Sequence, residues 1–276
     1  MRIKLASSYG FCYGVKRAIE IAQHNPNSKT YGPLIHNKDE ISRLKQNYNI
    51  DLATSLDELH PQETVIIRTH GITKNELQIL KKQNNTIINA TCPYVTKPQQ
   101  IVDRMSKEGY SVVIFGDKDH PEIKGVYSYG QEKNTFIVNT PDDIDFGLLH
   151  SKVAVVSQTT RKPQDFEKIV NALTSRLKEV RVFNTICNAT FENQDAAMEL
   201  AQEADIMIVI GGKHSSNTKQ LHSICKSYCN HSFLIENESE IVPQWFEGKA
   251  LCGISAGAST PDWIVQNVIN TIQQIA

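Results

Sequence analysis

The stretch RIKLASSYGFCYGVKRAIEIA, residues 2–22, holds a short apolar run, then Cys12, then a segment with helical spacing. The same order recurs in NTIINATCPYVTKPQQIV, residues 85–102, around Cys92, and in RVFNTICNATFENQDAAMEL, residues 181–200, around Cys187. The cysteines lie 80 and 95 residues apart, so each belongs to a unit of similar length. Repetition at such a period is typical of stacked or symmetric modules. Three thiolates from three like units can meet on one axis and hold a common group.

Apolar runs of strand length alternate with amphipathic helical stretches along the chain. The clearest expected strands are residues 64–69, 86–91, 111–116, 152–157, 205–211 and 249–255. Strands that alternate with helices predict parallel sheets covered on both faces. We therefore predict an α/β fold of three quasi-equivalent units, residues 1–92, 93–187 and 188–276. Residues 1–12 are a candidate partner for the last unit.

Residues other than cysteine repeat at matched positions. Gly116 and Gly211 each lie 24 residues after the cysteine of their unit, and Lys118 and Lys213 are 95 residues apart. Any α/β protein shows some recurrence of a strand followed by glycine and a loop. Agreement of several residue types at matched offsets favours a true repeat.

Composition and charge exclude several classes of function. With a formal net charge of −1, the chain of 276 residues has no electrostatic footprint for nucleic acid or an anionic membrane. No run approaches the length needed to span a bilayer. The start, MRIKLASSYGF, lacks an apolar signal core, so we expect a cytoplasmic protein with reduced thiols.

The three repeated cysteines fit an iron–sulfur cluster better than the alternatives. Structural zinc sites usually show closely paired cysteines, which these lack, and disulfides need an oxidising location. Clusters are held by cysteine thiolates, usually four. With three, one iron of a 4Fe-4S cube has no protein ligand and can act on a substrate oxygen; loss of that iron would leave a 3Fe-4S form. The other cysteines, Cys225, Cys229 and Cys252, fit buried structural positions, although Cys225 and Cys229 could also suit a surface metal.

Two polar loops follow each cysteine, after expected strands. The nearer loops hold His36, His120 with Glu122, and Ser215-Ser216-Asn217; the farther loops hold His70, Thr159-Thr160, and Ser259. In open α/β sheets, ligands bind beyond the carboxyl ends of strands. Histidine nitrogens, hydroxyls, an amide and loop NH groups can all donate to phosphate oxygens, so this set favours an anionic ligand. Singly, each of these residues could instead cap a helix or close a turn.

Eight short motifs follow one another along the chain: GFCYGV, GPLIHN, RTHG, NATCP, HPE, QTT, SSN and AGASTPDW. This set resembles the 4-hydroxy-3-methylbut-2-enyl diphosphate reductase family, which carries out the last step of the non-mevalonate isoprenoid pathway. The resemblance covers nearly the whole chain. It implies a trefoil of three α/β units around a central cavity, with a 4Fe-4S cluster on Cys12, Cys92 and Cys187.

The resemblance also implies the reaction and the residue roles. An iron–sulfur oxidoreductase of this kind removes the allylic hydroxyl of (E)-4-hydroxy-3-methylbut-2-enyl diphosphate and yields isopentenyl and dimethylallyl diphosphates. Glu122 would supply a proton, with Thr159 and His120 beside the hydroxyl. Ferredoxin or flavodoxin would deliver the electrons. The implied diphosphate-binding residues are His36, His70, Ser215, Asn217 and Ser259, with Ser216 and Thr160 nearby.

Two rival functions stay open at this point. A cluster-dependent dehydratase would also use an open iron, but it would need no external reductant. A non-catalytic iron–sulfur protein that senses redox state would need a partner surface, and it would leave the histidine, serine and asparagine loops unexplained.

Overall fold

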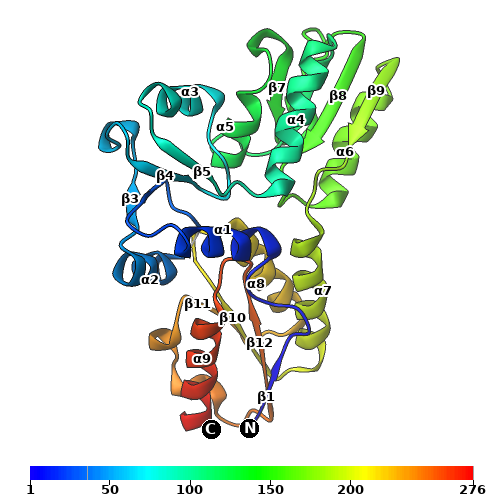
Figure 1. The fold of residues 1–276 in the computed structure, drawn as a ribbon. Helices are drawn as coiled ribbons and strands as arrows, with labels where there is room; N and C mark the ends of the chain where they lie inside the picture. The colour runs from blue at the N-terminus through cyan, green and yellow to red at the C-terminus, as the bar shows by residue number, and fades with distance from the viewer. Residues whose placement is uncertain (36, 276) are drawn as a thin grey trace. The chain divides into compact units, whose positions relative to one another are not determined.

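The computed structural model describes residues 1–35 and 37–275, apart from the side chain of Thr190. Its framework is three parallel sheets of four strands each (Figure 1). The strand orders are β1-β12-β10-β11 in sheet A, β3-β2-β4-β5 in sheet B and β7-β6-β8-β9 in sheet C. The α/β prediction with parallel sheets is therefore confirmed.

The strands run as follows: β1 Arg2–Leu5, β2 Lys29–Tyr31, β3 Asp51–Ala53, β4 Thr64–Ile67, β5 Thr86–Asn89, β6 Ser111–Phe115, β7 Thr135–Val138, β8 Lys152–Ser157, β9 Glu179–Phe183, β10 Ile206–Ile210, β11 Ser232–Ile235 and β12 Leu251–Ala256. All six strands expected from apolar runs are present. Strands β2 and β3 did not stand out in the sequence because they are only three residues long, which is too short for a clear periodic signal.

The helices are α1 Tyr13–Gln23, α2 Lys38–Tyr48, α3 Lys74–Lys82, α4 Pro93–Lys107, α5 Pro121–Tyr127, α6 Pro163–Thr174, α7 Asn188–Glu203, α8 Ser216–Tyr228 and α9 Asp262–Ile275. Short 3₁₀ turns occupy Leu56–Glu58, Glu132–Asn134, Pro141–Asp143, Glu238–Glu240 and Pro243–Phe246. Pro93, Pro121 and Pro163 each stand at the first helical position, where proline's missing N–H costs nothing.

The three sheets have the same topology. In each, the strand that leads to a cysteine lies at one edge: β5 before Cys92, β9 before Cys187, and β1 before Cys12. The first of these strands in the chain, β1, pairs in parallel with β12, so sheet A joins the two ends of the sequence. After each cysteine a helix begins: α1, α4 and α7.

The chain forms two compact units. Unit 1 contains Met1–Lys16, Ile35–Asn47 and Asn188–Ala276 and holds sheet A. Unit 2 contains Arg17–Leu34 and Tyr48–Cys187 and holds sheets B and C. The expected boundaries at residues 92 and 187 follow sequence repeats rather than these units, and they stay a prediction.

Each sheet is covered by helices, as the continuous apolar runs predict. In sheet C, Ile101, Val102 and Met105 of α4 pack on Val112 and Ile114 of β6. In sheet A, β10 is fully buried: Ile206, Ile208 and Ile210 face one cluster with α9, and Met207 and Val209 face another with α7 and α8. Strands buried on both faces leave their polar groups for the loops beyond their ends. No helix among residues 1–35 and 37–275 is long and apolar enough to cross a membrane.

Candidate functional site

The three repeated cysteines are held in the same way. The backbone N–H of Cys12 donates to the Ala258 carbonyl (3.2 Å), that of Cys92 to Thr69 (3.0 Å), and that of Cys187 to Thr159 (2.8 Å). Each acceptor lies in the polar loop that follows the neighbouring strand of the same sheet: β12, β4 or β8. Because parallel strands end at the same edge of a sheet, every cysteine is fixed beside one of the predicted ligand loops.

The exposure of the cysteines separates them into two groups. Cys12, Cys92 and Cys187 are half-buried and form no disulfide, whereas Cys225, Cys229 and Cys252 are buried. Burial raises the pKa of Cys225 and of Cys252 to about 12, which keeps both as neutral thiols. The first group is therefore the accessible one, and the second belongs to the core of unit 1.

In unit 2, Glu122 and Thr159 form a buried pair. The Thr159 N–H donates to Glu122 Oε1 (2.8 Å), and the Thr159 hydroxyl donates to Oε2 (2.7 Å). Glu122 is only 2% exposed. Since the Thr159 carbonyl also accepts from Cys187, this one threonine connects the carboxyl group to the loop of a repeated cysteine.

The environment of Glu122 changes its acidity. Burial raises the pKa of the carboxyl group above its ordinary value, while the two hydrogen bonds from Thr159 favour the ionised form and oppose the rise. A carboxyl group with a raised pKa can hold a proton nearer neutrality and donate it. The pair can therefore act as a general acid.

Two histidines come together beside this pair in unit 2. His120 precedes α5, and its Nδ1 accepts from the Glu122 N–H (3.2 Å). The rings of His70 and His120 meet edge to face, with their centroids 5.5 Å apart. The structure thus brings His70, His120, Glu122 and Thr159 into one neighbourhood, and their predicted roles toward a substrate stay predictions.

Gln158 is a residue of this neighbourhood to which the sequence analysis gave no role. Its side chain is buried, accepts from the Asp117 N–H (3.0 Å) and donates to the Thr160 hydroxyl (3.4 Å). It thereby ties the loop of His120 to the loop of Thr159 and Thr160. A glutamine directly after a buried strand was the only available signal, and nothing in the sequence named its partners.

In unit 1, the loops of Ser215 and Ser259 lie close together. Added Cβ atoms at Gly211 and Gly257 would stand 2.9 Å and 2.3 Å from the Thr218 hydroxyl, so only glycine fits this contact. The Gly257 N–H also donates to Ile210 (2.8 Å) at the end of β10. Cys12, bound to Ala258, belongs to the same group of loops.

The side chains of the SSN motif differ in their surroundings. Ser215 caps α8 by accepting from the Thr218 N–H (3.3 Å), which is the structural alternative for this residue, and Ser216 is exposed. Asn217 is 7% exposed, and neither its amide nitrogen nor its oxygen finds a hydrogen-bond partner among the described residues. Since buried polar groups are normally paired, Asn217 is suited to receive a ligand. Ser259 is half-buried.

Some predicted residues stay untested. His36 lies outside the described residues. Cys12 belongs to unit 1 and Cys92 and Cys187 to unit 2, so the convergence of the three sulfur atoms stays a prediction. Within either unit, the described His, Cys, Asp and Glu side chains form no group of three that could hold a metal ion alone.

Known proteins were compared with the whole chain. The LytB protein family model matches residues 3–273. The chain belongs to the LytB family. Two of its relatives are named 4-hydroxy-3-methylbut-2-enyl diphosphate reductase. The one from a Sulfurovum species is 70% identical to this chain, and the match covers all of both chains. The one from a Nitratiruptor species is 60% identical, and the match covers all of this chain and 99% of the relative.

Solved structures of LytB-type reductases agree with this assignment. One, the "Structure of (E)-4-Hydroxy-3-methyl-but-2-enyl Diphosphate Reductase, the Terminal Enzyme of the Non-Mevalonate Pathway", is 41% identical, covers 99% of each chain and has a TM-score of 0.77. The reductase from Plasmodium falciparum is 27% identical, covers 97% of this chain and 86% of that one, and has a TM-score of 0.87. The family suggested by the eight motifs is confirmed.

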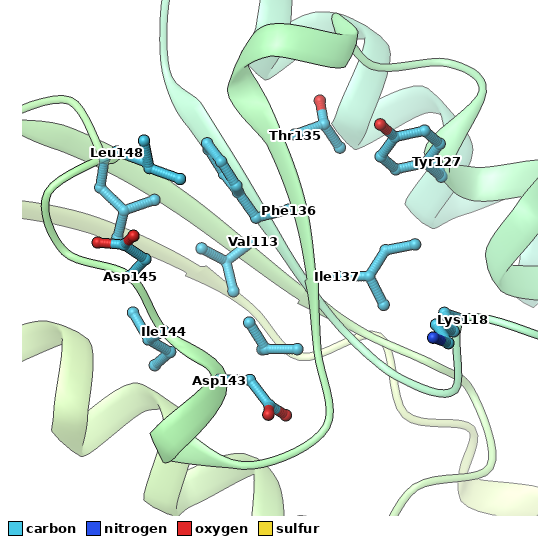
Figure 2. A pocket seen from close by; sticks show the side chains of 12 residues that line it. Val113, Lys118, Tyr127, Thr135, Phe136, Ile137, Asp143, Ile144, Asp145 and Leu148 are labelled. Atoms are coloured by element: carbon cyan, nitrogen blue, oxygen red, sulfur yellow. The ribbon is translucent and has the colours of Figure 1, made fainter.

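A separate hollow in this LytB chain lies beside β7 in unit 2 (Figure 2). Its volume is about 380 Å³, and its lining is mostly apolar, with Val113, Phe136, Ile137 and Leu148 among the side chains drawn. None of the predicted site residues lines it. The hollow is therefore distinct from the neighbourhood of Glu122.

The buried carboxyl group predicts a pH-dependent stability. Below pH 4.5, the ordinary pKa of glutamate, Glu122 is protonated in both the folded and the unfolded chain. Above this pH the carboxyl group ionises first in the unfolded chain. The free energy of unfolding therefore falls until the pH passes the raised pKa of the folded state. Glu122→Gln lacks this penalty. Its melting temperature relative to the unaltered protein should rise from pH 4.5 upward and then level off, as followed by circular dichroism.

Asp143→Asn is the matched control for this measurement. Hydrogen bonds from the backbone of Asn139 and Thr140 lower the pKa of Asp143, so this carboxylate stabilises the fold at higher pH and loses that effect as pH falls. The melting temperature of Asp143→Asn relative to the unaltered protein should therefore change with pH in the opposite direction, falling as the pH rises. A Glu122→Gln difference that stays constant with pH would contradict a raised pKa.

Proposed function

We propose that this chain reduces (E)-4-hydroxy-3-methylbut-2-enyl diphosphate to isopentenyl and dimethylallyl diphosphates. The single observation that carries the proposal is the Glu122–Thr159 pair, because it joins a buried proton donor to the loop of Cys187. The names of the relatives support the same reaction.

Cys12, Cys92 and Cys187 would hold a 4Fe-4S cluster. Their fit to this group is supported by two observations: they are half-buried, and each backbone N–H is anchored to a ligand loop. When bound, such a cluster supplies Lewis acidity and one-electron transfer. Cys225, Cys229 and Cys252 are too buried to serve in its place.

The diphosphate would bind to polar groups of the loops after the strands. Asn217 supports this role most directly, since its buried amide has unmet hydrogen-bonding capacity. His36, His70, Ser215 and Ser259 complete the proposed set, with Ser216 and Thr160 beside it. Donors of this kind bind phosphate oxygens without a strong positive charge.

Glu122 would deliver the proton that lets the hydroxyl oxygen leave as water. Thr159 orients the carboxyl group through two hydrogen bonds, and His120 precedes α5, the helix that carries Glu122. In the net reaction, one C–O bond breaks, two electrons and two protons are consumed, and a C–H bond and water form. Protonation at either end of the allyl system yields the two products.

An external donor has to supply the two electrons, and we assign this role to ferredoxin or flavodoxin in the cytoplasm. This requirement separates a reductase from a dehydratase, which exchanges no electrons with a partner. Turnover of the hydroxylated diphosphate with reduced methyl viologen tests the proposal. No turnover by the iron-loaded protein would refute it.

Iron binding tests the cysteine assignment without reference to activity. Protein purified without oxygen should contain about four irons per chain and absorb broadly in the visible range. Cys92→Ser should lose most of this iron, as measured by iron analysis and absorption spectra. Cys225→Ala is the matched control and should retain it, because Cys225 lies in the core of unit 1. Full iron in Cys92→Ser would contradict the assignment.

Replacement of Asn217 tests the diphosphate site. Asn217→Ala should raise the KM for the substrate about 10-fold or more, the usual weight of a hydrogen bond to a charged group. The exposed Asn230, just beyond α8, gives a matched control, and Asn230→Ala should leave the KM unchanged. An unaltered KM in the Asn217 variant would place the diphosphate elsewhere.

Replacement of Glu122 tests the proton donor. Glu122→Gln should keep its iron content while kcat falls by a factor of about 10² or more, as expected when a general acid is removed. Glu20→Gln, on the exposed face of α1, should keep full turnover. Full turnover in the Glu122 variant would exclude this residue from the reaction.

A further inference from the structure

Helix α4, which begins directly after Cys92, carries a basic stripe on its exposed face. Beyond Pro93, the exposed positions are Tyr94, Lys97, Gln100, Arg104 and Lys107. These positions are three or four residues apart, so they lie on one side of the helix. The opposite side, with Ile101, Val102 and Met105, is buried against sheet C. We call the five exposed residues the α4 stripe.

The acidic groups near the α4 stripe do not cancel its charge. Asp103 is the only carboxylate of α4, and it already pairs with both Lys74 (3.7 Å) and Lys107. In the described part of the chain, no carboxylate pairs with Lys97 or Arg104. Arg104 instead lies over the Phe183 ring, 5.9 Å from its centroid. The stripe therefore presents positive charge to solvent.

The corresponding helix after Cys187 has the opposite charge. Helix α7 exposes Glu192, Asp195, Glu199 and Glu203 and contains no lysine or arginine. Helix α1, after Cys12, is mixed, with exposed Lys16 and Glu20. The formal net charge of −1 thus hides a strong difference between equivalent helices. Of these three helices, the one after Cys92 has the largest net positive charge, with three basic residues and one carboxylate, against Lys16 and Arg17 with Glu20 in α1.

The stripe begins close to a proposed cluster ligand. Tyr94 is 47% exposed and stands two residues after Cys92. Lys97 stands five residues after Cys92, roughly 7 Å along the helix axis at about 1.5 Å per residue. Exposed tyrosine together with arginine is a composition that protein interfaces favour, and the lysines add positive charge.

We propose that the α4 stripe is the docking surface for the electron donor, an acidic one-electron carrier protein. This inference rests on the proposed function, which needs two electrons per substrate from outside the chain. Two reduced carriers each give one electron; together with two protons these break the C–O bond and release water. The charge of the stripe selects an acidic partner and steers its approach, whereas α7 repels it.

The experiment compares turnover driven by a protein electron donor with turnover driven by a small-molecule electron donor. Lys97→Glu and Arg104→Glu in the iron-loaded enzyme should each raise the KM for a reduced acidic ferredoxin about tenfold at low salt, where screening is weak. Turnover with reduced methyl viologen should stay unchanged, since the small donor needs no docking surface. Tyr94→Ala should also raise the KM for ferredoxin, without changing its salt dependence.

Lys226→Glu is the matched control. Lys226 is exposed on α8 in unit 1, and its reversal changes the net charge by the same amount. Its KM for ferredoxin should match that of the unaltered enzyme. An unchanged KM in both Lys97→Glu and Arg104→Glu, or an equal rise in Lys226→Glu, would overturn the docking surface. Loss of methyl viologen turnover in the unaltered enzyme would instead refute the proposed function.

Discussion

The hydrogen bond from each repeated cysteine to the loop after the neighbouring strand is the contact on which the site depends. It occurs once in each sheet, at Cys12, Cys92 and Cys187. The bond links the segment after an edge strand to the loop after the neighbouring strand. It therefore brings a thiol and a polar loop together in each sheet that repeats this topology. At Cys187 the acceptor is Thr159, whose other donors hold Glu122. The repeated placement of a cysteine beside a polar loop is thus a consequence of sheet geometry that is used three times.

Much of the fold could be predicted from local patterns. The apolar runs at residues 111–116, 152–157 and 205–211 became central strands, because strands buried on both faces must be apolar throughout. The helices after the three cysteines were also expected, and proline after Cys92 marks one of their starts. Short edge strands such as β3 were missed, since three residues carry no period.

The site could be predicted in its members but not in its contacts. Loops after strands supplied His70, His120, Glu122 and Thr159, yet the sequence could not show that Thr159 binds both carboxyl oxygens of a residue 37 positions away. Gln158 belongs to the QTT motif, but its role was not foreseen because it depends on partners from two loops. The opposite charges of α4 and α7 can be counted in the sequence, but the exposed stripe on α4 emerges only when burial is known.

The pairing of β1 with β12 has a consequence for how the molecule is made. During translation β12, the neighbour of β1 in sheet A, is synthesised roughly 250 residues after β1, which at about 5–20 residues per second means a wait of some 10–50 s. Sheets B and C can be complete by then, because their strands are contiguous in the chain. Cys12 therefore reaches its anchor on Ala258 only after residues 251–258 have been synthesised, so nascent chains cut short before them retain two cysteine loops and lack the third.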